Sequence, residues 1–176
     1  MTQAQATRKA RQLLEEQGHE IPVNVEEIAK AKGAVLVKQD LEDSVSGVLM
    51  IKDGRGIIVV NEGHHPNRQR FSIAHELGHY LLHPDAGSVF VDRSPVFFRD
   101  RRSSEGVRQH EIDANAFAAE LLMPEKDLKA QLNDRPIDAF DDVSVRRLAA
   151  RFGVSAQALT IRLTSLDLVT LTAEGV

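Results

Sequence analysis

The sequence contains no cysteine, and this absence excludes two kinds of structure. Disulfide bonds cannot form, and a structural zinc site built on thiolates is impossible. Any bound metal ion must therefore take its ligands from histidine, aspartate or glutamate side chains. The lack of cysteine also agrees with a reducing compartment such as the cytosol.

Long apolar runs are missing as well. Residues 1–6 lack the apolar core of a signal peptide, and no later stretch is long and apolar enough to span a bilayer. We therefore expect a cytoplasmic protein with no membrane partner. The chain also lacks a strong excess of either charge, since its net charge is only −4. This balance argues against nucleic-acid binding over the whole surface, although a local basic patch could still bind.

The length of 176 residues, with 42% hydrophobic residues, fits one domain with a real core and a small helical appendage. Periodicity and capping signals predict helices and strands in a definite order. The expected helices are residues 2–17, 24–33, 66–82, 107–122, 126–132, 145–152 and 156–166, and the expected strands are residues 34–38, 47–51 and 56–60. Residues 85–104 and 133–142 are expected to be irregular.

Short strands followed by long helices are typical of an α+β fold. Asp53-Gly54 between the last two strands predicts a hairpin. We expect a small, twisted, mostly antiparallel sheet from residues 34–60, packed against the helix of residues 66–82. Residues 1–132 would form the core domain, and residues 143–176 a C-terminal helical segment packed on it.

The helix of residues 66–82 carries His75-Glu76-Leu77-Gly78-His79, an HExxH pattern. A spacing of four residues leaves the two histidines roughly 40° apart around the helix and about 6 Å apart along it. Both imidazoles can therefore reach one metal ion. Glu76 is offset by one residue, so it is suited to act on the attacking water as a general base.

A bare HExxH pattern also occurs by chance, on a surface helix with two histidines. Here the motif is surrounded by apolar residues: Phe71, Ile73, Ala74, Leu77, Tyr80, Leu81 and Leu82. Buried polar groups are costly unless they are paired or bind a metal. The context therefore favours a metal site, and Gly78 predicts that another segment approaches this helix closely.

Catalytic zinc usually has three protein ligands. On the helix of residues 107–122, Glu111 and Asn115 are four apart and share one face. We predict Glu111 as the third ligand and Asn115 as a residue that orients a ligand. Asp113 is a second candidate, and in the alternative interpretation both acidic residues are simply solvated.

His83 lies one turn beyond His79. It could be a metal ligand, a proton donor or the C-terminal cap of the helix, and we favour the cap. His83 or Tyr80 could also help to stabilise an oxyanion during a reaction.

Two segments resemble the signatures of the ImmA/IrrE family of metallo-endopeptidases. Residues 68–83 resemble the family's HExxH helix, and residues 111–124 resemble its second signature, an acidic pair followed by Ala-Asn, Phe-Ala and Leu-Leu-Met-Pro. The resemblance covers roughly residues 8–165, and two signatures are far more specific than HExxH alone. One departure is Asp113, where the family often has glutamate; the change is conservative and does not affect Glu111.

The resemblance implies a minimal thermolysin-like zincin core, in which His75, His79 and Glu111 hold the zinc ion and Glu76 is the catalytic base. Manganese could replace zinc, because nitrogen and oxygen ligands are not highly selective. The family also implies a protein substrate, namely a helix-turn-helix repressor or an antitoxin, in stress or mobile-element regulation. The identity of the substrate does not carry over.

Residues 148–159 fit a helix-turn-helix pattern, and Arg146, Arg147, Arg151 and Arg162 would give this region a basic side. The pair of helices either binds DNA, or completes the core and docks a protein; we favour the second interpretation. The arginine-rich stretch of residues 93–108 is either a loop over the cleft or an exposed loop without a role.

Two hypotheses for the function follow. The first is a zinc endopeptidase, and the alternative is a non-hydrolytic, metal-containing regulator that binds DNA or a repressor. Glu76 favours the first, because a protein that only binds has no need of a general base. We expect an extended substrate segment to pair with the edge of the strand at residues 57–60, because main-chain hydrogen bonds bind peptides without demanding a sequence.

Overall fold

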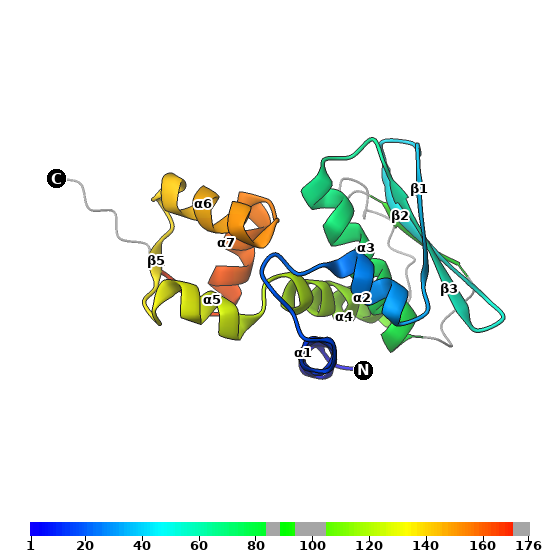
Figure 1. The fold of residues 1–176 in the computed structure, drawn as a ribbon, viewed down its shortest axis with the longest axis horizontal. Coiled ribbons are helices and arrows are strands. Elements are labelled where there is room, and N and C mark those ends of the chain that lie inside the picture. Colours follow the sequence, from blue (N-terminus) through cyan, green and yellow to red (C-terminus); the bar gives the residue numbers. More distant parts are fainter. Residues whose placement is uncertain (84–88, 94–104, 171–176) are drawn as a thin grey trace.

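The computed structural model describes residues 1–83, 89–93 and 105–170. Its elements form two neighbouring groups, a four-stranded sheet with helices on one side and a smaller group of C-terminal helices (Figure 1). The architecture is α+β, as expected from the order of the elements. Among the described residues, no helix is both long and apolar enough to cross a membrane.

The sheet has the strand order β1-β3-β2-β4. Strand β1 is parallel to β3, whereas β2 is antiparallel to both β3 and β4. Asp53 and Gly54 join β2 to β3 with positive φ angles of 51° and 75°, which confirms the predicted hairpin. The strands are β1 (Val35–Gln39), β2 (Val45–Lys52), β3 (Arg55–Asn61) and β4 (Val89–Arg93).

Two expectations about the sheet are wrong. Strand β4 lies within residues 85–104, which were expected to be irregular; the remainder of that stretch, with most of its arginines, lies outside the described residues. Strand β3 lies in the interior of the sheet, because β1 and β2 pair with its two sides. The predicted pairing of a peptide with residues 57–60 is therefore impossible without displacing a strand.

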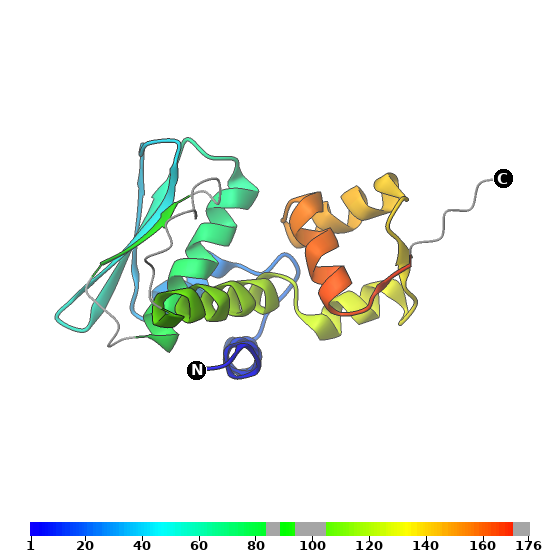
Figure 2. The same ribbon diagram turned by 180° about the vertical axis from the view of Figure 1, so that it is seen from behind.

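Helix α3 (Pro66–Leu82) packs on one face of the sheet, and α4 (Glu105–Leu122) packs against α3 (Figure 2). The inward side chains of the sheet, such as Leu49 and Ile58, are fully buried beneath α3. Helix α1 (Gln3–Gln17) packs on α4, and α2 (Val25–Ala31) packs on α3. These elements make α3 the centre of the larger group.

The ends of α3 agree with the sequence. Pro66 occupies the first turn, where a missing N–H is harmless, and His83 is the C-cap residue, its backbone N–H donating to the carbonyl of His79 over 3.0 Å. The capping role predicted for His83 is confirmed, and its ring is buried.

The C-terminal group contains α5, β5, α6, α7 and β6, and the short strands β5 and β6 are parallel (Figure 1). The helices α6 and α7 meet at Gly153, whose φ of 64° suits the turn expected there. The bounds are α5 (Glu125–Leu132), β5 (Ile137–Asp138), α6 (Asp142–Phe152), α7 (Ala156–Ser165) and β6 (Val169–Thr170). Strand β5 thus lies in a stretch expected to be irregular, and the proposed domain boundaries stay a prediction.

Polar contacts fasten this group to the two central helices. Asn67 of α3 donates its amide to the carbonyl of Val154 over 2.9 Å, and Arg70 donates to the carbonyl of Gly153 over 3.0 Å. On the other side, the guanidinium of Arg162 pairs with the buried carboxylate of Glu120 on α4. Arg162 is therefore buried, and the expectation that it contributes to a basic surface is wrong.

Candidate metal centre

Three side chains from α3 and α4 converge on one point. His75 Nε2 and His79 Nε2 are 3.0 Å apart, and the carboxylate oxygens of Glu111 lie 3.3 Å from the first and 3.2 Å from the second. In a tetrahedral zinc site with metal–ligand distances near 2.0 Å, neighbouring ligand atoms are about 3.3 Å apart. The two imidazole nitrogens and the nearest carboxylate oxygen to each are therefore about as close as ligand atoms in such a site, and one ligand atom from each of the three residues lies within 4.8 Å of the other two.

Gly78 explains how α4 comes so close. A Cβ atom at this position would lie 3.2 Å from the Cα of Ala114, so a side chain here would require the backbone of α4 to move by a few tenths of an ångström. The prediction that Gly78 admits a neighbouring segment is confirmed, and that segment is α4. The close contact brings Glu111, one turn before Ala114, to the two histidines.

The contact of His75 with Asn115 indicates which ring nitrogen of His75 carries the proton. His75 Nδ1 lies 3.1 Å from the side-chain oxygen of Asn115, which can only accept, so Nδ1 carries the proton. In a neutral imidazole the lone pair is then on Nε2, the atom that faces His79 and Glu111. Asn115 thus contacts the ring of His75, as its predicted role requires, and that role in orienting a ligand stays a prediction.

The local charges favour the metal-binding forms of these groups. Burial lowers the pKa of His79, although its hydrogen bond with Glu111 acts in the opposite direction. Burial also acts to raise the pKa of Glu111, but hydrogen bonds and attraction from His75 and His79 outweigh it and hold that pKa well below its usual range. A neutral imidazole and an ionised carboxylate are the forms that bind metals.

Exposure is uneven across the group. The side chains of His75 and His79 are almost fully buried, whereas that of Glu111 keeps 31% of its surface exposed. The group is therefore open to solvent on the side of α4, as a site that must admit a substrate requires.

Glu76 lies beside this group, on the face of α3 that meets β2. Its carboxylate oxygens are inaccessible to solvent, and a Cβ atom added to Gly47 of β2 would lie 3.2 Å from one of them. Gly47 thus leaves the room that this carboxylate occupies. The sequence suggested no role for Gly47, because a glycine within a strand has several explanations.

Asp113, the second candidate for the third ligand, does not join the group. It is fully buried, accepts a hydrogen bond of 2.8 Å from Gln109, and lies 3.9 Å from Nε2 of His83. His83 in turn stacks on His110, with ring centroids 3.9 Å apart. These four residues form a separate polar cluster at the end of α3.

Two aromatic residues complete the surroundings. Phe90 of β4 stacks on the ring of His79, with centroids 4.9 Å apart, and sequence reasoning missed it because it missed the strand. Tyr80 donates its hydroxyl to the carbonyl of Gly54 over 3.0 Å, at the β2–β3 hairpin. That bond engages Tyr80 with the hairpin, so it does not support the oxyanion role considered for this residue.

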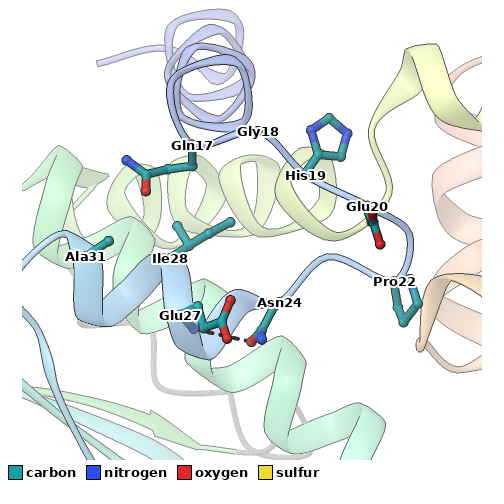
Figure 3. A pocket seen from close by; sticks show the side chains of 9 residues that line it. All are labelled: Gln17, Gly18, His19, Glu20, Pro22, Asn24, Glu27, Ile28 and Ala31. Carbon is teal, nitrogen blue, oxygen red and sulfur yellow. Dashed lines mark hydrogen bonds between the residues drawn. The ribbon is translucent and has the colours of Figure 1, made fainter.

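A hollow of the described surface lies away from this group. It has a volume of about 680 Å³ and lies between the end of α1, the following loop and α2, with Gln17, His19, Glu20 and Glu27 on its walls (Figure 3). Glu27 belongs to the first turn of α2, and its backbone N–H donates to the side chain of the N-cap residue Asn24. The walls hold none of the three converging side chains, so this hollow is separate from the donor group.

Comparison with known proteins agrees with this geometry. The model of the peptidase M78 family, described as the IrrE N-terminal-like domain, matches residues 29–164, which include all three converging side chains. Over 109 residues, 62% of the chain, the sequence is 29% identical to the metallopeptidase ImmA of Bacillus subtilis. Over 102 residues, 58% of the chain, it is 29% identical to the uncharacterized immunity region protein 2 of Bacillus phage phi105.

The matches cover 59% and 60% of the lengths of these two relatives. Among solved structures, a transcriptional regulator of Mycobacterium tuberculosis superposes with a TM-score of 0.63. That match covers 97% of the present chain and 48% of the other, with 18% sequence identity, so it establishes the fold alone.

Proposed function

The chain belongs to the IrrE N-terminal-like family of metallopeptidases, and from this premise we propose that it is a zinc-dependent endopeptidase that cleaves a cytoplasmic protein partner. His75, His79 and Glu111 would hold the zinc ion, and manganese would be able to replace it. Because the curated relatives are longer than the matched region, the activity of the whole protein is part of this proposal.

The observation that carries the proposal is the convergence of two imidazole nitrogens and one carboxylate within 3.3 Å of one another. All three present lone pairs when His75 and His79 are neutral, and a cation between them would satisfy all three at once. A set of two nitrogens and one oxygen is that of many catalytic zinc sites. The residues present therefore fit the metal that the family implies.

A zinc ion held by these residues would supply Lewis acidity, which would polarise the scissile carbonyl and make a water molecule more acidic. The chain supplies the base. Glu76, adjacent to His75 and held between α3 and β2, would take a proton from the attacking water and deliver it to the nitrogen of the leaving amine. Asn115 would keep the ring of His75 in position during these steps.

We propose that the substrate pairs with β4 rather than β3. Among the described strands, β4 pairs only with β2, so no described strand occupies its other side, and an extended peptide would pair there. Phe90 of β4 stacks on His79, which places this strand directly beside the donor group. A peptide added along β4 would therefore run past the metal.

The proposed partner is a helix-turn-helix repressor or an antitoxin encoded close by. The support is the family itself and the names of two relatives, an immunity region protein and ImmA. The segment to be cleaved must be extended, since a folded helix cannot pair with a strand. We therefore expect low activity on partners whose cleavage segment stays folded.

The test is to co-express the chain with the product of the neighbouring gene and to look for a fragment by mass spectrometry. Wild-type protein should generate the fragment, and Glu76→Gln should abolish it while the protein keeps its metal. Glu62→Gln, which removes an exposed carboxylate, is the matched control and should cleave normally. Cleavage by Glu76→Gln at the wild-type rate would show that the proposed mechanism is wrong.

The alternative function is a non-hydrolytic regulator that binds DNA or a repressor. The exposed side of α7, which would be the recognition helix, presents Gln157, Ile161 and Thr164 and no cation. DNA contacts depend heavily on cations, so this face does not favour direct DNA binding. A neighbour that stays intact but loses its DNA binding in the presence of the chain would support regulation without hydrolysis.

A further inference from the structure

A hollow in the C-terminal group is lined by arginine. Its volume is about 360 Å³, and it lies between the end of α5, the segment before β5 and the side of α6. Arg135, Arg147 and Arg151 line it together with the apolar side chains of Leu132, Ile137 and Leu148, and no carboxylate contributes to the lining. The hollow thus combines an apolar surface with three cations.

These three arginines differ from their neighbours in their pairing. Arg146 pairs with Asp142 over 3.0 Å, and Arg162 pairs with the buried Glu120. Within the described parts of the chain, no carboxylate lies within ion-pair distance of Arg135, Arg147 or Arg151, although the charge of Arg147 acts on Asp141 at longer range. Like charges gathered around one hollow repel each other, and a bound anion would relieve that repulsion.

Two exposed apolar residues come just before the lining residues of α6 in the sequence. Val143 of α6 is four residues before Arg147 and eight before Arg151, so the three side chains follow one face of the helix. Val143 is 66% exposed, and Phe140, just before the helix, is 67% exposed. Large apolar groups beside arginine are the composition found at the centres of protein interfaces.

We propose that this hollow is a docking site for an acidic, amphipathic segment of a partner protein. Carboxylates of the segment would bind the guanidinium groups, whose planar fork matches a carboxylate with two parallel hydrogen bonds. Apolar side chains of the same segment would cover Leu148, Val143 and Phe140. This docking needs no metal and is separate from the proposed peptidase chemistry.

The surrounding charge favours a protein segment over a nucleic acid. Residues 133–170 contain five arginines and five aspartates and are therefore neutral overall. A nucleic-acid site needs a wider excess of cations, because affinity comes mainly from phosphate contacts. A small set of arginines around an apolar surface instead suits a few carboxylates spaced along a peptide.

The experiment is fluorescence anisotropy with a labelled synthetic helical peptide that has glutamate on one face and leucine on the other. The full chain should bind it at low ionic strength, and the Arg147→Gln/Arg151→Gln double variant should bind about tenfold more weakly or worse, because two charge-assisted contacts are lost. Arg146→Gln is the matched control on the same helix and should change the affinity by less than about twofold, since its exposed pair with Asp142 contributes little.

Two further probes separate the possible ligands. The same peptide with glutamine in place of glutamate should bind far more weakly, and a DNA duplex should compete poorly. Equal affinities of the wild type and the double variant, or failure of the wild type to bind the acidic peptide, would overturn the proposal. Displacement of the peptide by lower concentrations of duplex would also overturn it and assign the hollow to nucleic acid.

Discussion

Two glutamates on α4, Glu111 and Glu120, have surroundings of opposite character. Glu120 is almost fully buried, and its carboxylate pairs with Arg11 of α1 over 2.7 Å and with Arg162 of α7. Glu111 keeps 31% of its side chain exposed and faces His75 and His79. The same residue type on one helix thus meets two guanidinium groups in one place and two imidazoles in the other.

The difference teaches how a carboxylate on a packed helix can either stabilise the fold or be left to bind a ligand. Arginine is always charged, so Arg11 and Arg162 neutralise Glu120 within the chain and tie α1, α4 and α7 together. His79 has a lowered pKa and is neutral near pH 7, so it offers a lone pair rather than a charge. The group around Glu111 therefore has room for a cation from outside, whereas the group around Glu120 does not.

The largest expected effect is on metal content. It compares the same substitution, glutamate to glutamine, at Glu111 and at Glu120. Glu111→Gln should lower the metal content from about one ion per chain to nearly none, because a carboxylate ligand is replaced by a poor one. Glu120→Gln should keep the ion, since it leaves the three donor atoms untouched. Elemental analysis of the purified, folded proteins measures both. Full metal content in Glu111→Gln would move the third ligand to Asp113 or elsewhere.

The second prediction concerns stability, and here Glu120 should have the larger effect and Glu111 the smaller. In metal-free protein, Glu120→Ala should lower the free energy of unfolding by about 3 kcal/mol or more, because it leaves the buried Arg162 without its partner. Glu111→Ala should change it by less than about 1 kcal/mol, since its side chain is partly exposed. Urea denaturation followed by circular dichroism compares the two variants. Equal losses of stability in the two variants would contradict the view that Glu120 stabilises the fold and Glu111 does not.

A smaller effect is expected at Asn115, which contacts Nδ1 of His75 on the side of the ring away from the three donor atoms. Asn115→Ala should weaken zinc affinity by about tenfold to a hundredfold, because Nδ1 of His75 loses its acceptor. Asn115→Asp keeps an acceptor and should retain the affinity. Competition with a chelating dye measures both variants. Unchanged affinity in Asn115→Ala would mean that packing alone orients His75.

The smallest effect tests the third buried polar cluster, around His83. Burial, aided by repulsion from His110 and His79, lowers the pKa of His83 to about 4, and Asp113 only partly opposes this. The ordinary value of about 6.5 applies to the unfolded chain, so between these two pH values the unfolded chain binds the proton more tightly. The free energy of unfolding of metal-free protein should therefore fall as the pH falls from about 6.5 towards 4.

His83→Asn removes this titration, so the fall in stability over that pH range should be shallower than in the wild type. The measurement is urea denaturation at a series of pH values, and the slope is compared rather than the absolute stability. Identical slopes in the two proteins would contradict the proposed role of His83 in the acid sensitivity.

The sequence by itself determined the features that depend on neighbours along the chain. The extent of α3, the placement of His75 and His79 on one side of it, and the turn at Asp53-Gly54 follow from helix periodicity and turn chemistry. The choice of Glu111 with Asn115 also came from a spacing of four residues; in the structure Glu111 lies beside the two histidines and Asn115 contacts His75, and the role of Glu111 as a ligand stays a prediction. The lack of cysteine alone restricted the metal ligands to nitrogen and oxygen donors.

Only the tertiary structure decided the features that depend on partners far away in the sequence. The position of β3 inside the sheet and of β4 beside His79 depends on strand pairing, and backbone donors and acceptors are alike in every residue. The burial of Arg162 depends on Glu120, which lies forty-two residues earlier and on another helix. A local pattern records which face of an element is apolar, but it does not record which element will cover that face, because that choice is made by packing in three dimensions.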